Sequence, residues 1–207
     1  MNQRSAQTRM PTSLLGKEVF MFGRIRFFVA AFFSLLLIQT LASCTATYKV
    51  DTLAMVPSID SSVSAASTGS RLAKSIVLGS VGGSGTLHMP GLATVSASEF
   101  RKALELSLSR AGFLASNQKT GRYRLDAFLI EIIQRDAGPT FNVDAVARYK
   151  ITNTSGAVLL QEVITSETSA NVGEIAAGGS AYMERVIKSN IYALLRRLNQ
   201  IDRRRGG

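Results

Sequence analysis

The spacing of apolar residues along the chain predicts two amphipathic helices. The stretch SASEFRKALELSLSRAGF (residues 96–113) has apolar residues three and four positions apart, the period of a helix that buries one face. Ser96 and Glu99 fit a capping box, and Gly112 is of the type that follows a helix end. A second helix is predicted over residues 180–201, with its first serine as the N-cap and a buried stripe of Met183, Ile187, Ile191, Leu194, Leu198 and Ile201.

Strand patterns occur in four other segments. Residues 76–78 form a short apolar run that ends in glycines, which is consistent with a buried strand. Residues 123–134 begin with alternation and then become apolar at three successive positions, which predicts a long strand with a bulge. Residues 141–151 alternate strictly, so one face is packed and the other is wet. The turn NTSG (residues 153–156) leads into residues 157–168 and predicts a hairpin.

The resulting order of elements is β-α-β-β-β-α, which predicts an α+β fold. Two helices would pack on one face of a four-stranded, mainly antiparallel sheet and cover its apolar side chains. This folded domain is expected over residues 74–201. Residues 44–73 are expected to form a flexible tether, because residues 57–70 are rich in Ser, Ala and Gly. The alternative for residues 48–56 is a short strand. Residues 202–207 are expected to form a basic tail.

The segment before the domain has the pattern of a secretory leader. Residues 27–38, FFVAAFFSLLLI, are apolar apart from one serine and follow Arg24 and Arg26. This run is too short to span a bilayer and has the length of a signal-peptide core. The leader ends in LASC, which contains Cys44, the sole cysteine. The alternative is a short transmembrane helix followed by a buried cysteine.

The LASC motif resembles the lipobox of bacterial lipoproteins. The resemblance implies a signal peptide over residues 1–43 and a lipid-modified (palmitate-bearing) Cys44, so that membrane lipid is a partner through the acyl chains. The signal-peptidase recognition residues would be Leu41, Ala42 and Ser43.

Two further features of the leader bear on sorting and on the start of translation. Cys44 is followed by Thr45 and Ala46 rather than by Asp, which in Gram-negative lipoproteins implies the periplasmic face of the outer membrane. Met21 would begin a more compact signal peptide, and the alternative is a genuinely long leader.

The charge of the chain changes once the leader is set aside. The chain has 24 basic and 14 acidic residues. Five of the basic residues and one of the acidic residues lie in residues 1–43, so 19 basic and 13 acidic residues remain after the leader. We predict no nucleic-acid partner, because the leader directs the domain out of the cytoplasm. Five outward-facing cations are candidates for contact with an anionic ligand: Arg148, Lys150, Arg203, Arg204 and Arg205. The alternative for Arg148 and Lys150 is an ordinary wet sheet face. The alternative for the three C-terminal arginines is a solvated chain end.

Residues with catalytic or metal-binding potential are sparse. The single histidine, His88, lies in a glycine-rich loop that has no nucleotide-binding spacing. The chain has no G-x-S-x-G elbow for a serine hydrolase, and one histidine with one cysteine cannot supply a zinc site. The carboxylates of Asp126, Glu131, Asp136 and Asp144 fall on strands or turns where solvated charges are expected. We therefore predict no enzyme activity, no cofactor and no metal.

Four stretches carry a wider resemblance over residues 74–200, namely residues 81–115, 123–132, 147–166 and 190–198. They resemble uncharacterised small bacterial lipoproteins with a YajG-like domain, and more distantly the lipopolysaccharide-assembly lipoprotein LptE. From the resemblance only Cys44 carries over, as the lipidation site. The anchor, the tether, the compact domain and the lack of a catalytic set predict a membrane-anchored periplasmic lipoprotein that acts as a non-catalytic interaction or assembly module with an envelope protein partner. The alternative is a module that binds or handles lipid or lipopolysaccharide.

Overall fold

The computed structural model describes residues 49–60, 63, 65–66, 69–86, 93–135, 138–177 and 179–205. The chain divides into two units, Met1–Thr45 and Ala46–Gly207, and every described residue belongs to the second. The expected signal peptide over residues 1–43, its Met21 start, the recognition residues Leu41, Ala42 and Ser43, and the lipidation site Cys44 lie outside the described residues, as does His88.

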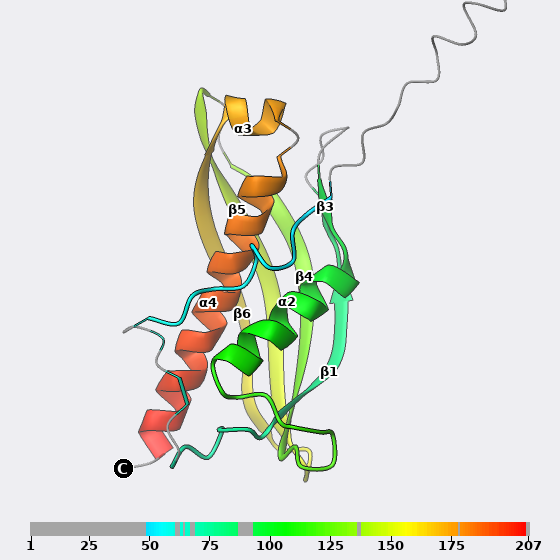
Figure 1. Ribbon diagram of the computed structural model, residues 1–207, viewed down its shortest axis with the longest axis vertical. Coiled ribbons are helices and arrows are strands. Elements are labelled where there is room, and N and C mark those ends of the chain that lie inside the picture. Colours follow the sequence, from blue (N-terminus) through cyan, green and yellow to red (C-terminus); the bar gives the residue numbers. More distant parts are fainter. Residues whose placement is uncertain are drawn as a thin grey trace, which may run out of the picture. The chain divides into compact units, whose positions relative to one another are not determined.

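One four-stranded sheet organises the second unit (Figure 1). Its strand order is β1-β4-β5-β6, with β1 parallel to β4 and the other neighbours antiparallel. The strands are β1 (Ile76–Gly83), β4 (Tyr123–Gln134), β5 (Thr140–Asn153) and β6 (Val158–Asn171). The short strands β2 (Gly85–Thr86) and β3 (Thr94–Val95) form a separate antiparallel pair.

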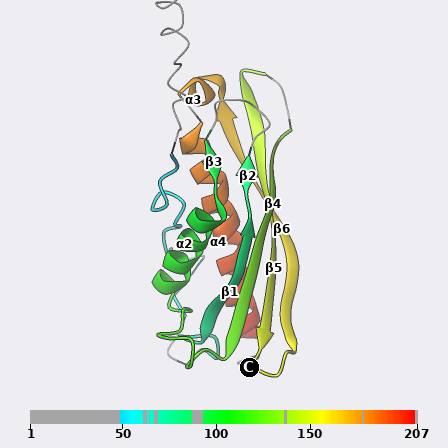
Figure 2. The same ribbon diagram turned by 90° about the vertical axis from the view of Figure 1, so that its right-hand side faces the viewer.

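The two long helices lie on one side of this sheet (Figure 2). They are α2 (Ala97–Arg110), which packs on β1, and α4 (Ser180–Arg205), which packs on β6 and β5. A five-residue helix, α3 (Val172–Ala176), precedes α4. The predicted α+β class, with both helices on one face of a mainly antiparallel sheet, is confirmed.

The helix ends confirm one local prediction and correct two others. The capping box of Ser96 and Glu99 is present, and Gly112 follows α2 with φ of +73°. At the start of α4, the carbonyl of Gly179 accepts the Met183 N–H at 3.3 Å, so the cap is one residue earlier than predicted. The basic tail expected from residue 202 is also wrong for residues 202–205, because α4 continues through them.

The core lies between the sheet and the two helices. Apolar side chains of β4 and β5 alternate toward α2 and α4, as the alternation of residues 141–151 predicts, and α2 contributes the face set by its three- and four-residue spacing. The largest fully buried side chains include Phe100, Leu104 and Leu108 of α2 and Leu125, Leu129, Tyr149 and Ile151 of the sheet.

Residues 49–66, here called the strap, correct the tether prediction. Figure 1 shows residues 49–60 crossing α4. Val50, Met55, Val56 and Val63 of the strap are buried. The Asp51 N–H donates to Glu184 Oε1 at 2.6 Å, which ties the strap to α4. The composition of this segment suggested an unstructured spacer. A few apolar residues are enough to hold it on the folded unit, because each buried apolar side chain contributes about 1.5–3 kcal/mol to the free energy of folding.

Candidate docking surface on the open sheet face

The face of the sheet opposite α2 and α4, here called the open face, is made by alternate residues of β4, β5 and β6. Strand register aligns them in rows across the sheet. One row contains Phe128, Arg148 and Val163, and the next contains Asp126, Lys150 and Gln161. Neither long helix covers this face (Figure 2).

Large apolar side chains are exposed at the middle of the open face. Phe128 is 44% exposed, Ile130 is 40% exposed and Val163 is 53% exposed. Ile130 lies at the predicted bulge, because the register of β4 and β5 shifts between Leu129 and Glu131. Ile130 is the extra residue and points outward like Phe128, two positions earlier, and the register shift then turns Glu131 outward as well. With three large apolar side chains exposed, the open face is more apolar than an ordinary wet sheet face.

Arg148 and Lys150, two of the sequence-predicted contacts, lie beside this apolar patch. The guanidinium carbon of Arg148 stands 5.6 Å from the centroid of the Phe128 ring, in a cation–π arrangement. Both cations are exposed, and neither forms an ion pair with another residue of the described part of the chain. Their charge is therefore available to a partner.

A shallow groove of about 420 Å³ brings these side chains together. Asp126, Phe128, Arg148, Lys150 and Gln161 line it from β4, β5 and β6, and residues 80–82 line it from β1. Two cations, an amide and an aromatic ring can hold a carboxylate or phosphate next to an apolar group. Sequence reasoning missed Phe128 and Gln161, although the apolar run at residues 128–130 was a signal that one apolar residue would face outward.

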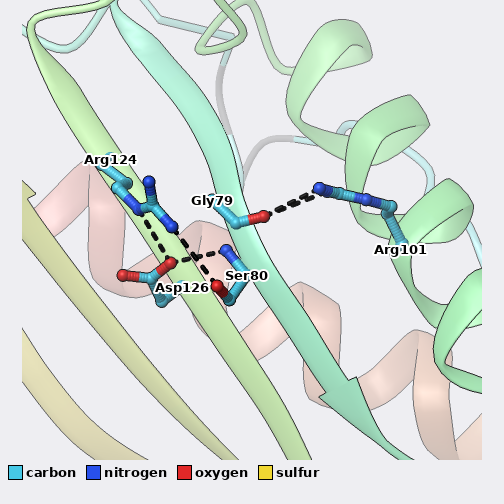
Figure 3. A network of polar contacts seen from close by, with 5 residues as sticks. All are labelled: Gly79, Ser80, Arg101, Arg124 and Asp126. Atoms are coloured by element: carbon cyan, nitrogen blue, oxygen red, sulfur yellow. Dashed lines mark hydrogen bonds and ion pairs between the residues drawn. The ribbon is translucent and has the colours of Figure 1, made fainter.

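The floor of the groove depends on an irregularity in β1. The pairing of β1 with β4 shifts between Leu78 and Val81, so Gly79 and Ser80 lack ordinary ladder partners. Side chains replace the ladder (Figure 3): Asp126 Oδ1 accepts the Ser80 N–H at 2.6 Å, and Arg101 donates to the Gly79 carbonyl at 2.8 and 3.2 Å. Arg124 completes the network by donating to Asp126 Oδ1 at 3.0 Å.

The opposite end of the open face is acidic. Asp144 is cross-strand to Glu167, and Glu131 lies one row away. Asp144 is buried, and its Oδ2 is ion-paired with Arg135. Its Oδ1 has no hydrogen-bond partner among the described residues. The open face thus changes from basic to acidic along the strands.

The other predicted cations are separated from the groove. Arg203 is exposed on the last turn of α4, which packs on the other face of the sheet. Arg204 and Arg205 also belong to α4, but their side chains lie outside the described part. The structure therefore brings together Arg148 and Lys150, and leaves the three C-terminal arginines apart from them.

The described residues also bear on metal binding and on membrane spanning. They contain no group of three or more side chains placed to hold a metal ion. None of the helices they form has both the length and the apolar composition needed to cross a membrane.

Comparisons with known proteins show the fold. No protein-family model and no curated protein matches the chain. The crystal structure of XCC0632 from Xanthomonas campestris, of family DUF330, has a TM-score of 0.51 at 12% identity, covering 77% of this chain and 99% of its own. That similarity confirms that this arrangement of sheet and helices occurs elsewhere.

Two further solved structures are more distant. The hypothetical protein CT253 from Chlamydia trachomatis has a TM-score of 0.44 at 11% identity, covering 60% of this chain and 96% of its own. The lipoprotein GNA1162 from Neisseria meningitidis has a TM-score of 0.33 at 11% identity, covering 56% of this chain and 99% of its own.

Proposed function

We propose that this protein is a lipid-anchored lipoprotein of the outer membrane, facing the periplasm, whose folded unit is a non-catalytic interaction module. The anchor rests on the leader and on Cys44 at its end. Two or three acyl chains would hold the protein on a membrane durably, since each buried methylene contributes about 0.8 kcal/mol. The resemblance to YajG-like and LptE lipoproteins belongs to the same proposal.

The strap places a limit on how far the folded unit can stand from the membrane. Val50 is buried in the core and follows Cys44 by six residues. A fully extended chain spans at most about 3.5 Å per residue, so six residues can reach no farther than about 21 Å. A lipidated Cys44 would therefore hold the core next to the bilayer, where it meets other envelope proteins.

The observation that carries the interaction role is the open face. Its apolar patch of Phe128, Ile130 and Val163 is exposed beside Arg148 and Lys150, which have no ion-pair partner in the described part. An apolar centre next to charged side chains is typical of a protein-binding surface. We propose that a protein of the envelope binds there.

Two experiments test the proposal on the full chain. Metabolic labelling with palmitate should mark the wild type and fail with Cys44→Ala, which should also lose its membrane association. A photo-crosslinking phenylalanine derivative at Val163 should yield a protein adduct, whereas the same derivative at the exposed strap residue Leu53 should not. Absence of an adduct at Val163 would refute the docking role, and equal labelling of both Cys44 forms would refute the anchor.

A lipid- or lipopolysaccharide-binding role is the second candidate, favoured by the groove. Arg148 and Lys150 line it together with Phe128, so it could hold a phosphate next to an apolar chain. Reversing both charges to Glu should abolish binding of the purified chain to lipopolysaccharide if this role is correct. Reversing the C-terminal Arg203 serves as the matched control. Unchanged binding in the double variant would exclude the groove.

A further inference from the structure

We infer that the partner of the open face is a second copy of this chain, bound face to face about a two-fold axis. This inference rests on the proposal that the open face binds protein. A two-fold interface must be self-complementary, because each patch meets the patch that the axis carries onto it. The open face has this property in its charge, its apolar residues and its size.

Charge is divided between the two ends of the open face. The end at which β4 begins holds three cations and one carboxylate, supplied by Arg124, Arg148, Lys150 and Asp126. Among the described residues, the end at which β4 finishes holds three carboxylates and one guanidinium, supplied by Glu131, Asp144, Glu167 and Arg135. Each end has an excess of two charges, and the two excesses have opposite sign.

A two-fold axis across the strands places these ends over each other. An axis midway between two packed sheets and perpendicular to the strands reverses strand direction, so β5 of one copy lies over β5 of the other. Asp144 and Lys150 are each three residues from Ala147. An axis near Ala147 therefore brings the basic end of each copy to the acidic end of the other. The opposite arrangement would set like charges together.

The apolar residues gather beside the same axis. Val146 lies in the row on one side of Ala147, and Phe128 and Val163 lie in the row on the other side. Ile130 lies between these rows at the bulge. The resulting interface has an apolar centre and charged ends, and apolar burial at the centre is the main source of affinity in such contacts.

The dimensions of the sheet suit a stable dimer. β5 and β6 are each 14 residues long, which corresponds to about 45 Å at ~3.3 Å per residue. The three strands of the open face, each about 4.8 Å wide, cover a width of about 14 Å. The face thus offers about 650 Å², within the roughly 600–1,000 Å² that each partner buries in an ordinary specific interface.

In this dimer, carboxylates of the second copy would lie at the groove of the first. Glu131 and Glu167 are exposed at the acidic end, so in the second copy they approach the end that carries Arg148 and Lys150. A carboxylate between two cations next to an aromatic ring is the chemistry predicted for an anionic ligand.

Complementary charge variants test the second copy directly. Two differently tagged full-length chains are expressed together, extracted in mild detergent, and recovered through one tag. An acidic variant carries R148E and K150E, and a basic variant carries E131K and E167K; all four positions are exposed. We expect wild-type chains to recover each other, and each variant to recover its own kind about tenfold less. The acidic variant should recover the basic variant at the wild-type level.

Any outcome that differs from these expectations overturns the inference. Wild-type chains that do not recover each other exclude the dimer, and equal recovery of all combinations excludes this face. If the acidic variant does not recover the basic variant, and circular dichroism shows that both are folded, the two-fold arrangement is excluded. Gln substitutions at the same four positions provide a second, milder set of variants. The crosslink at Val163 separates the two proposals. An adduct with a different protein refutes the second copy and keeps the docking role, whereas no adduct refutes both.

Discussion

The hydroxyl of Tyr149 on β5 donates a 2.7 Å hydrogen bond to the side-chain oxygen of Asn190 on α4, and both residues are fully buried. The Asn190 amide nitrogen donates at 2.9 Å to the carbonyls of Ala145 and of Ile164. Asn190 therefore joins the helix to two neighbouring strands and satisfies three groups that water cannot reach. This contact fixes the position of α4 on the sheet.

Asn190→Ala should destabilise the unit by at least about 3 kcal/mol. It leaves one hydroxyl and two carbonyls buried without a side-chain partner, and an unsatisfied buried group costs about 1–3 kcal/mol. The measurement is urea unfolding of Ala46–Gly207, which contains every buried residue named above. Arg196→Ala, an exposed change on the same helix, should stay within about 0.5 kcal/mol of the wild type. Equal effects of the two changes would mean that Asn190 does not anchor α4.

Two buried tyrosines should respond differently to replacement by Phe. Tyr149→Phe removes the donor to Asn190 and should cost about 1–2 kcal/mol. The hydroxyl of Tyr182 has no hydrogen-bond partner among the described residues, so Tyr182→Phe should be neutral or should stabilise by about 1 kcal/mol. Thermal unfolding of the two variants side by side measures the difference. A destabilised Tyr182→Phe would reveal a partner for that hydroxyl.

The free energy of unfolding should fall as pH rises above 10. Burial raises the pKa of Tyr182 from 10.0 to about 12 and that of Tyr149 still further. Between pH 10 and 12 the unfolded chain loses these protons while the folded chain keeps them, so alkali favours unfolding by up to about 1.4 kcal/mol per pH unit for each tyrosine. Urea unfolding between pH 8 and 12 should show this slope, and the double Phe variant should show a shallower one. An unchanged slope in that variant would assign the alkaline effect to other groups.

Met55→Ala should cost about 2–4 kcal/mol, although its position was expected to lie in a tether. The Met55 side chain is fully buried in the core, and truncation of a buried Met to Ala leaves a cavity. Leu53→Ala is the matched control, because Leu53 is 57% exposed on the same strap. Urea midpoints of the two variants decide the matter. A Met55 variant as stable as the Leu53 variant would restore the tether interpretation.

Gly79→Ala should destabilise the β1 irregularity by about 2 kcal/mol or more. A Cβ at Gly79 would overlap the Asp126 carboxylate and the Arg124 guanidinium, so the network in Figure 3 would have to open. Gly69→Ala is the control, because nothing lies within 4 Å of a Cβ there. Hydrogen exchange at the Ser80 amide reports the effect locally. Protection as slow as in the wild type would show that the network tolerates a side chain.

Much of the fold could be read from local pattern. The capping box of Ser96, the turn at residues 153–156 and the strict alternation of residues 141–151 depend on contacts between near neighbours, so they are visible in sequence and were found in the structure. The bulge at Ile130 was also predicted, because three successive apolar residues cannot all point to one face of a strand. The class of fold followed from the order of these elements.

The strap and the continuation of α4 could not be read in this way. Met55 stands in the short run LAMV and Val63 among serines and alanines, and neither belongs to a sustained apolar period. Only the packing of the whole unit makes them core residues. Similarly, the basic residues after position 201 indicated a solvated end, yet the backbone hydrogen bonds of a long packed helix propagate through them.

The sequence by itself determined the main elements, the capping box of Ser96 and the hairpin turn, because each depends on residues close together in the chain. It predicts in addition a leader that ends before Cys44. It also determined that Arg148 and Lys150 face away from the core. Tertiary structure alone decided that Phe128 and Val163 join these cations on one exposed surface, and that carboxylates gather at its far end. That arrangement comes from the register of three strands, which brings together side chains tens of residues apart and is set by the packing of the whole sheet.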